Sequence, residues 1–160
     1  MVDTGELKKF ELFSVFSDAQ LKKIADLTEK KSYKAKDHVY EHGDRGKYLF
    51  VVTKGLLSLR ELQPGDQVGI AFEMRERGEM FGAACFMKPQ QYTLTAVCLE
   101  DSELLAVDAD KLFDLCDTEP EVGYKLMKKI AQLYFERYKV AKRQLREMVK
   151  APTIITALPG

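Results

Sequence analysis

Hydrophobic and polar positions follow two different periodicities along the chain. Apolar residues recur at helical spacing in residues 6–30 and again in residues 108–150, whereas residues 32–107 consist of short β-rich runs separated by turn residues. We therefore expect a central β domain between two helical regions. Residues 151–160 carry no charge and two prolines, and are interpreted as a tail that docks through Ile154 and Ile155.

The N-terminal region predicts short aromatic helices. Phe10, Phe13 and Phe16 are spaced by three, and Ser17 with Gln20 forms a capping-box pattern ahead of the next apolar residues. Two helical turns alone cannot bury three phenylalanine side chains, so we expect these helices to cap a larger body.

The central region predicts an antiparallel β structure. Its strand-like runs are separated by glycine-rich turns, which favours a sandwich or barrel over parallel βαβ units. Within one run, Leu94, Ala96 and Cys98 alternate with their neighbours and are expected on the inward face. The predicted runs are residues 36–40, 48–53, 56–60, 67–77, 92–99 and 103–107, with a turn at residues 63–66.

The C-terminal region predicts two helices. Asp108 is a candidate cap for a short helix at residues 111–116. Thr118 with Glu121, and Pro120 within the first turn, predict the start of a much longer helix.

The long helix carries a seam with alternating spacings of four and three, typical of a coiled coil. A second apolar face overlaps the seam on the N-terminal half and consists of Val122, Leu126, Ile130, Leu133 and Val140. We expect one face to pack on the β domain and the other on a second copy of the helix, giving a homodimer. The alternative is one wide stripe packed wholly on its own domain. The seam residues are Met127, Ala131, Tyr134, Tyr138, Ala141, Leu145 and Met148.

Composition and charge exclude several classes. The 160 residues include 25 basic and 25 acidic side chains, so no global basic field attracts nucleic acid or a membrane surface. The net charge of zero is the sum of a basic region at residues 119–150 and an acidic remainder of the chain. No apolar run is long enough for a membrane span, and the first residues lack the charged-then-apolar pattern of a secretion signal, so we expect neither feature.

The chemistry-bearing residues do not predict an enzyme. Cys85, Cys98 and Cys116 form no metal-binding or disulfide pattern and are expected as buried hydrophobes in a reducing cytoplasm. His38 and His42 are the only histidines, too few for a cupin-type metal site. No serine-hydrolase, phosphate-loop or dinucleotide motif occurs. We therefore predict no catalytic residue, no metal and no cofactor.

The most informative segment is residues 77–97. Gly82 followed by residues 83–87 predicts a tight turn that opens one helical turn, whose free backbone amides form a small anion site. This segment resembles the phosphate-binding cassette of cyclic nucleotide-binding domains, as in catabolite activator-type regulators, kinase regulatory subunits and gated channels. Further matches cover residues 10–149, including Gly43-Asp44 and the strand at Tyr48–Val52.

The resemblance implies a mainly β fold: a double-stranded β-helix, or jelly-roll β-roll, with flanking N-terminal helices and a long C-terminal dimerising helix. The domain then covers residues 1–150. Its ligand pocket lies between the cassette and the long helix. The implied ligand-binding residues are Phe81, Gly82, Ala83, Ala84, Cys85, Tyr92, Thr93, Arg137 and Tyr138.

The cassette departs from the family pattern at its charged positions. Ala83 stands at the position of the glutamate that holds the ribose, and Tyr92 at the position of the arginine that pairs with the cyclic phosphate, while Thr93 keeps the hydroxyl. A charge-assisted hydrogen bond contributes about 1.5–3 kcal/mol, so losing both partners should weaken cyclic-nucleotide binding by about two or more orders of magnitude.

Two residues of the long helix favour ligand binding. Arg137 and Tyr138 fall where the family's C-terminal helix reaches over the nucleotide base, so Arg137 supplies a cation and Tyr138 and Tyr92 stack on a flat ring. The alternatives are a solvated charge for Arg137, a seam residue for Tyr138, and a surface aromatic beside a shrunken pocket for Tyr92.

Two functions therefore fit the sequence. The first is a cytoplasmic, non-enzymatic sensor module that binds a cyclic nucleotide or other small ligand in a non-standard way. The second is a vestigial pocket in a domain that works by dimerisation or by binding an unidentified protein partner. Too few residues follow the long helix for a helix-turn-helix, so we expect no direct DNA binding and no membrane partner.

Overall fold

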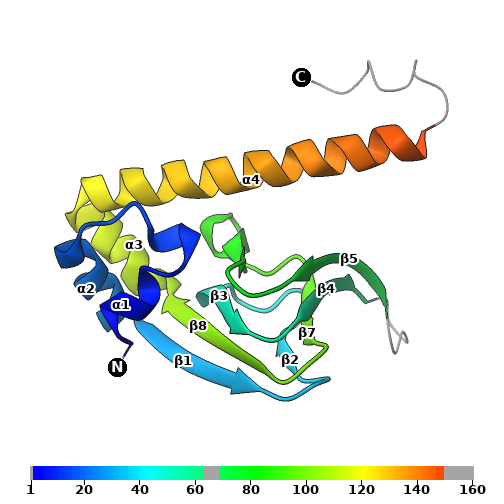
Figure 1. The fold of residues 1–160 in the computed structure, drawn as a ribbon, viewed down its shortest axis with the longest axis horizontal. Coiled ribbons are helices and arrows are strands. Elements are labelled where there is room, and N and C mark those ends of the chain that lie inside the picture. Colours follow the sequence, from blue (N-terminus) through cyan, green and yellow to red (C-terminus); the bar gives the residue numbers. More distant parts are fainter. Residues whose placement is uncertain (1, 63–68, 150–160) are drawn as a thin grey trace.

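The computed structural model describes residues 2–62 and 69–149 as a β-roll with helices at one end and along one side (Figure 1). The helical elements are α1 (Thr4–Leu7), η1 (Glu11–Phe13), α2 (Asp18–Asp26), η2 (Ala83–Phe86), α3 (Ala109–Thr118) and α4 (Pro120–Met148). The strands are β1 (Thr28–Tyr33), β2 (His38–Tyr40), β3 (Tyr48–Lys54), β4 (Leu57–Glu61), β5 (Ile70–Arg75), β6 (Met80–Phe81), β7 (Thr95–Cys98) and β8 (Ser102–Asp108).

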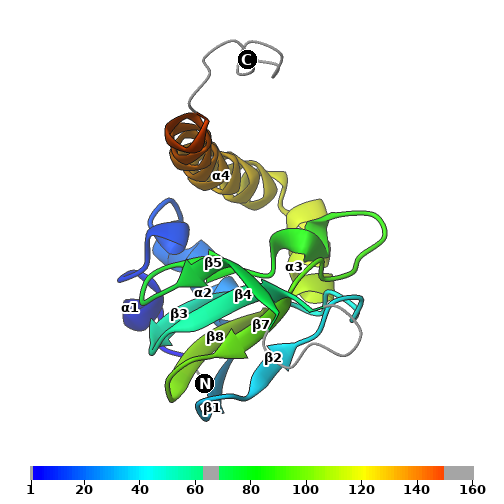
Figure 2. The ribbon, with the colours of Figure 1, turned by 90° about the vertical axis from the view of Figure 1, so that its right-hand side faces the viewer.

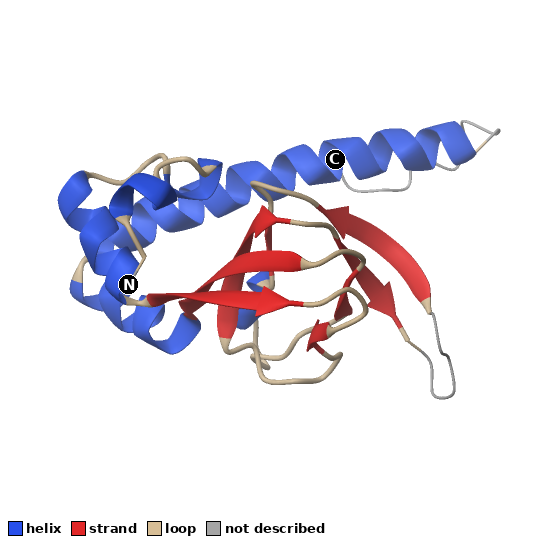
Figure 3. Ribbon diagram, turned by 60° about the horizontal axis from the view of Figure 1, so that its bottom comes forward, coloured by secondary structure: helices blue, strands red, loops and turns tan. Residues whose placement is uncertain are grey.

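The strands form two antiparallel four-stranded sheets (Figure 3). One sheet has the strand order β1-β8-β3-β6 and the other has the order β2-β7-β4-β5. All pairings are antiparallel, which confirms the predicted jelly-roll β-roll with flanking helices. The first sheet lies between the helices and the second sheet.

Strands β3 and β8 are buried on both faces, and this explains their continuous apolar runs. Leu49 and Val51 of β3 contribute to a core shared with the helices, whereas Phe50 and Val52 contribute to a core shared with the second sheet. Strand β8 divides its residues in the same way between the two cores. A strand with two buried faces needs apolar side chains at every position instead of alternation.

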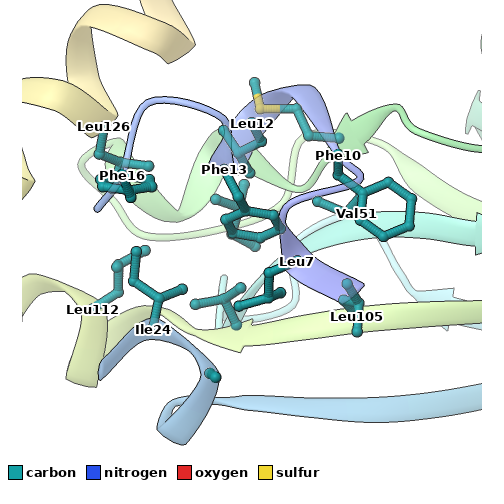
Figure 4. Close-up of a cluster of buried hydrophobic side chains, with 14 of the residues drawn as sticks. Leu7, Phe10, Leu12, Phe13, Phe16, Ile24, Val51, Leu105, Leu112 and Leu126 are labelled. Atoms are coloured by element: carbon teal, nitrogen blue, oxygen red, sulfur yellow. The ribbon is translucent and has the colours of Figure 1, made fainter. Parts of the chain in front are cut away.

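The core between the first sheet and the helices, which we call the helical core, contains the N-terminal aromatic residues (Figure 4). These side chains could not be buried within their own short helices. Phe10, Phe13 and Phe16 pack with residues of β3, β8 and α2, and with Leu112 of α3 and Leu126 of α4. We expected these short helices to cap a larger body. Their phenylalanine side chains are indeed buried against one face of the first sheet.

Local signals set the start of α2, but the predicted end of the N-terminal helical region was wrong. Ser17 and Gln20 form both bonds of a capping box, as predicted. Strand β1 begins at Thr28, so the helical region ends before residue 30. The strand was missed because β1 is an edge strand with charged side chains, and lacks the apolar alternation of a half-buried strand.

The start of the two C-terminal helices is partly as predicted. Asp108 caps α3 by accepting a hydrogen bond from the Lys111 amide at 3.1 Å. Pro120 occupies the first turn of α4, but Thr118 does not cap that helix. The Thr118 hydroxyl instead donates to carbonyl oxygens of the last turn of α3, at Asp114 and Leu115.

Helix α4 runs along the whole length of the molecule, from α3 to a position above β5 (Figures 1 and 2). Val122 and Leu126 are buried in the helical core, and Ile130 and Leu133 are half-buried. Val140 was expected on the same packed face but is 50% exposed. The side-chain packing of this face on the helical core therefore ends before the last turns of α4.

Two predicted features, the turn at residues 63–66 and the tail with Ile154 and Ile155, lie outside the described residues. None of the helices within the described ranges is long and apolar enough to cross a membrane.

Packing of α4 against the core can be tested with Leu126→Ala. We expect a loss of about 2–5 kcal/mol in the free energy of unfolding, because the truncation leaves a cavity among fully buried neighbours. Val140→Ala removes apolar atoms from an exposed position of the same helix and should cost less than about 1 kcal/mol. Urea denaturation of both variants measures the difference, and equal losses would contradict this account of helix docking.

Candidate functional site

The turn at Gly82 has the predicted geometry. Gly82 follows β6 in the left-handed region with φ of +80°, and η2 follows directly as the expected helical turn. A Cβ atom at this position would lie 3.0 Å from the Tyr48 carbonyl oxygen and 3.3 Å from the Tyr92 ring. Glycine is therefore required both by the backbone conformation and by the close approach.

The helical turn after Gly82 packs on the loop that follows β2. A Cβ atom added at Gly46 would lie 2.8 Å from the Cys85 Cα atom, so the two backbones are in direct contact. The Cys85 side chain is buried in the helical core. Burial raises the pKa of its thiol to about 12, so the thiol stays protonated at neutral pH. Cys85 is thus a packing residue of the turn, while Ala83 and Ala84 are half-buried beside it.

Tyr92 occupies the interior of the β-roll. Its side chain is 4% exposed, and its ring stacks on the ring of Tyr40 with centroids 3.6 Å apart and an interplanar angle of 14°. The interpretation of Tyr92 as a surface aromatic is therefore wrong, and stacking of its ring on a ligand stays a prediction. The ring is buried because Tyr40, distant in sequence, offers an apolar partner inside the roll.

The Tyr92 hydroxyl completes the edge of the first sheet. Strand β6 pairs with β3 only at Phe50 and Val51, so it ends before reaching Tyr48. The hydroxyl donates to the Tyr48 carbonyl oxygen at 2.8 Å and accepts from the Tyr48 amide at 3.0 Å. A tyrosine hydroxyl can do both, because it is donor and acceptor at once.

Four aromatic rings fill the space between the two sheets. Phe50 stacks on Phe81 with centroids 4.9 Å apart, and Tyr40 lies 6.0 Å from each of these rings. Burial raises the pKa of Tyr40 and of Tyr92 well above the usual value, so both phenols remain neutral. The predicted ligand residues Phe81, Gly82 and Tyr92 do come together: the rings of Phe81 and Tyr92 both contact Tyr40, and the Tyr92 ring lies beside Gly82.

Thr93 follows Tyr92 at the surface, where its side chain is exposed. The backbone of Tyr92 pairs with the turn at Gly43 and Asp44, through amide-to-carbonyl distances of 2.8 and 2.9 Å. This pairing fixes the chain direction so that the side chain of Tyr92 points inward and that of Thr93 outward.

Arg137 lies elsewhere, against β6 and β5. Its Nη2 atom donates to the Met80 carbonyl oxygen at 2.7 Å, and its guanidinium lies 5.2 Å from the centre of the Tyr134 ring. Desolvation, with the positive charge of Arg75, lowers the pKa of Arg137 from its ordinary value. The interpretation of Arg137 as a solvated helix charge is therefore wrong.

Tyr138 is exposed on α4 and belongs to the seam surface. Its ring lies 6.5 Å from Phe135, with the Lys142 ammonium 5.6 Å above it. The structure thus places Arg137 against β6 and β5 and Tyr138 on an exposed face of α4. Tyr92 contacts β2 and β3 instead.

A cavity of about 710 Å³ lies between β5 and α4, and of the ligand-binding residues predicted from the sequence Arg137 is the one that lines it. We call it the β5–α4 groove. Exposed Phe72 and Met74 on an edge strand were the available signal, since apolar side chains at such positions often mark a binding surface. The lining residues are Ala71, Phe72, Glu73, Met74, Arg75, Glu79, Glu136, Arg137, Val140, Ala141 and Gln144.

Polar contacts also hold the loop that carries Gln90. The Gln90 amide donates to the Gly46 carbonyl oxygen at 2.8 Å and to Asp110 at 3.3 Å. Asp110 in turn pairs with Arg45 at 2.7 Å. In the described part of the chain, no three histidine, cysteine or acidic side chains are grouped so that they could hold a metal ion.

A family model described as the cyclic nucleotide-binding domain matches residues 30–119, more than half of the chain. The chain belongs to the cyclic nucleotide-binding domain family. Domains of this family are regulatory modules. The match spans the β-roll with both aromatic residues of the stack, Tyr40 and Tyr92, and the turn at Gly82.

Known structures share this cyclic nucleotide-binding domain fold. A Geobacter metallireducens protein described as cyclic nucleotide-binding aligns over 86% of this chain and 99% of its own, with 21% identity and a TM-score of 0.77. The Thermus thermophilus catabolite activator protein aligns over 86% of this chain and 62% of its own, with 23% identity and a TM-score of 0.67.

A sequence relative is the Drosophila melanogaster cGMP-dependent protein kinase, isozyme 2, at 23% identity over 121 residues. The match covers 74% of this chain but 13% of the kinase. The present chain therefore spans about an eighth of the length of that relative.

The bridging hydroxyl can be tested with Tyr92→Phe. We expect a loss of about 1–3 kcal/mol in the free energy of unfolding, because the variant leaves the Tyr48 amide and carbonyl without their partner. Tyr124→Phe removes a hydroxyl from a residue that is 65% exposed and should have almost no effect. Urea denaturation compares the two, and a stability of Tyr92→Phe equal to wild type would contradict the bridging contact.

Proposed function

We propose that this domain is a regulatory interaction module whose cyclic-phosphate site is closed by its own Tyr92. The observation that carries the proposal is the buried position of Tyr92, which stacks on Tyr40 and bridges the backbone of Tyr48. Of the two functions that fit the sequence, this is the vestigial pocket with a dimerisation or protein-binding function.

Energetics supports this choice over a nucleotide sensor. Moving a buried aromatic ring out of a core costs about 3–5 kcal/mol, and leaving backbone groups unpaired costs about 1–3 kcal/mol more. A nucleotide that must displace the Tyr92 ring therefore loses at least about two orders of magnitude in affinity. Ala83 offers no carboxylate to offset this loss.

We further propose that α4 pairs with a second copy of itself. The large seam residues Met127, Tyr134, Tyr138, Leu145 and Met148 are between 41% and 80% exposed on a single helix. Contiguous apolar surface of this kind is typical of interfaces between protein chains. The three free thiols fit a domain that works in the cytoplasm.

Nucleotide binding separates the two functions. We expect no binding of cyclic AMP or cyclic GMP to the wild-type chain at millimolar concentration, in calorimetry or thermal shift. A ligand at 100 times its Kd would raise stability by about 2.7 kcal/mol, a shift that is easy to observe.

Two variants show which element closes the site. Tyr92→Ala removes the ring together with its bridging hydroxyl, and the double variant Ala83→Glu/Tyr92→Arg also restores both charged partners; circular dichroism checks that each is folded. We expect binding at least tenfold tighter in the double variant than in Tyr92→Ala. Micromolar binding by the wild-type chain would refute a closed site.

The dimer can be tested by solution mass. Ala131→Glu and Leu145→Glu place charges in the seam, where burial against a second helix would be strongly unfavourable, so each should give a monomer. Arg143→Glu changes the charge on the opposite face and should leave a dimer. Light scattering after size-exclusion chromatography measures the mass, and one mass for all variants and the wild type would refute the seam.

A further inference from the structure

Strand β5 forms an open edge of the second sheet. In the strand order β2-β7-β4-β5 it is hydrogen-bonded to β4, and no strand of the described ranges pairs with its outer side. Phe72 is 57% and Met74 is 45% exposed on this strand. Edge strands are usually protected by charged side chains or covered by another segment, because an open apolar edge invites pairing with other chains. Two large apolar side chains at this edge therefore indicate that a further segment covers β5.

The β5–α4 groove beside this edge has an apolar wall and an acidic surplus. Phe72 and Met74 of β5 face the same cavity as Val140 and Ala141 of α4. Three carboxylates outnumber two guanidinium groups among the charged residues of the lining. These charged residues are Glu73, Glu79, Glu136, Arg75 and Arg137.

Both guanidinium groups of the groove are already held by the protein. Arg75 pairs with Glu73 and donates to the Met80 carbonyl oxygen at 3.2 Å. Arg137 donates to the same oxygen at 2.7 Å, and its Nη1 atom is covered by protein atoms. The surplus of carboxylates repels an anion, since like charges at close range are unfavourable. The occupant that fits this groove is therefore uncharged and apolar.

Residues 151–160 of this chain have that chemistry. They lie outside the described ranges, and their sequence contains no charged side chain. Residues 153–156, Thr-Ile-Ile-Thr, are consecutive β-branched residues, which favour an extended backbone, and Leu158 adds a third large apolar side chain. An extended apolar segment suits a groove that is lined by five consecutive residues of a strand, 71–75.

The end of α4 brings this segment close to the groove. Gln144 lines the groove, and α4 ends at Met148, about 6 Å further along the helix axis. Figure 1 shows this end of the helix above β5. An extended chain spans at most about 3.6 Å per residue, so the stretch from Met148 to Thr153 covers up to about 18 Å. The segment can therefore turn back and lie beside β5 without any movement of α4.

We propose that residues 151–160 dock in the β5–α4 groove of their own chain, with Ile154 and Ile155 against the apolar wall of β5. The docked segment covers the open edge of the second sheet and joins the end of α4 to the β-roll. This docking goes beyond the function proposed above, because it requires neither a closed site at Tyr92 nor the pairing of α4.

A single tryptophan can report on the segment, because the chain contains none. In the full chain with Ile155→Trp, we expect the emission of a buried indole, with acrylamide quenching at least twofold weaker than when Met74→Glu is added. Met74→Glu places a carboxylate in the apolar wall, which disfavours docking. Met87→Glu, at a methionine that is 63% exposed outside the groove, is the matched control and should leave the quenching unchanged.

A reciprocal reporter places the indole in the groove instead. In the full chain with Phe72→Trp, adding Ile154→Glu/Ile155→Glu should shift the emission to longer wavelength and raise the quenching at least twofold, because the acidic lining repels the new carboxylates. Ile154→Val/Ile155→Val keeps apolar side chains at both positions and should leave the emission unchanged. Circular dichroism checks that every variant is folded.

The outcomes separate docking within one chain from its alternatives. If Met74→Glu leaves the quenching of the Ile155→Trp protein unchanged, or if the Phe72→Trp protein does not respond to Ile154→Glu/Ile155→Glu, the proposal is overturned. Both measurements are repeated with Leu145→Glu, and light scattering gives the solution mass. Protection of the indole that persists at monomer mass supports docking within the chain. Protection that disappears with the dimer would show that the segment docks on a second copy, which contradicts the proposal.

Discussion

The structure depends on a constraint in the first sheet, where β3 and β8 are buried on both faces. The central side chains of these strands, residues 49–52 of β3 and 104–107 of β8, alternate between the two cores, so a shift of register by one residue would exchange the two sets. The short strand β6 repeats the division, with Met80 in the helical core and Phe81 in the aromatic core. The two cores are therefore held together by backbone hydrogen bonds as well as by packing.

This constraint explains why a tyrosine suits position 92. Strand β6 is too short to pair with Tyr48, so that residue presents an amide and a carbonyl to the interior. A tyrosine hydroxyl satisfies both groups, whereas a guanidinium only donates and would leave the Tyr48 amide unpaired. The tyrosine that stands in place of the family's arginine thus satisfies the hydrogen-bonding groups of the local backbone. Its stacking on Tyr40 also buries its ring.

Features that depend on neighbouring residues could be predicted from the sequence, and features that depend on distant ones could not. The capping box at Ser17, the left-handed turn at Gly82 and the start of α4 at Pro120 are local, and all three are observed. The burial of Tyr92 requires Tyr40 and Tyr48, which only the sheet topology brings near. The groove beside Arg137 likewise arises from the approach of α4 to β5, and edge strand β1 has no apolar pattern to reveal it.

The contacts that hold α4 on the rest of the domain differ along the length of the helix. Its first turns are buried at Val122 and Leu126, and Arg137 makes the polar contact to β6. The segment from Tyr138 to Met148 has exposed side chains and is about three turns long, and an isolated helix of fewer than about 12–15 residues is only marginally stable in water. In α4 this segment continues from the anchored first turns, so it is already nucleated and can fray from Met148 backwards. Under the proposed pairing of α4, a chain that covered these apolar side chains would raise the helicity of this end without any movement of the β-roll.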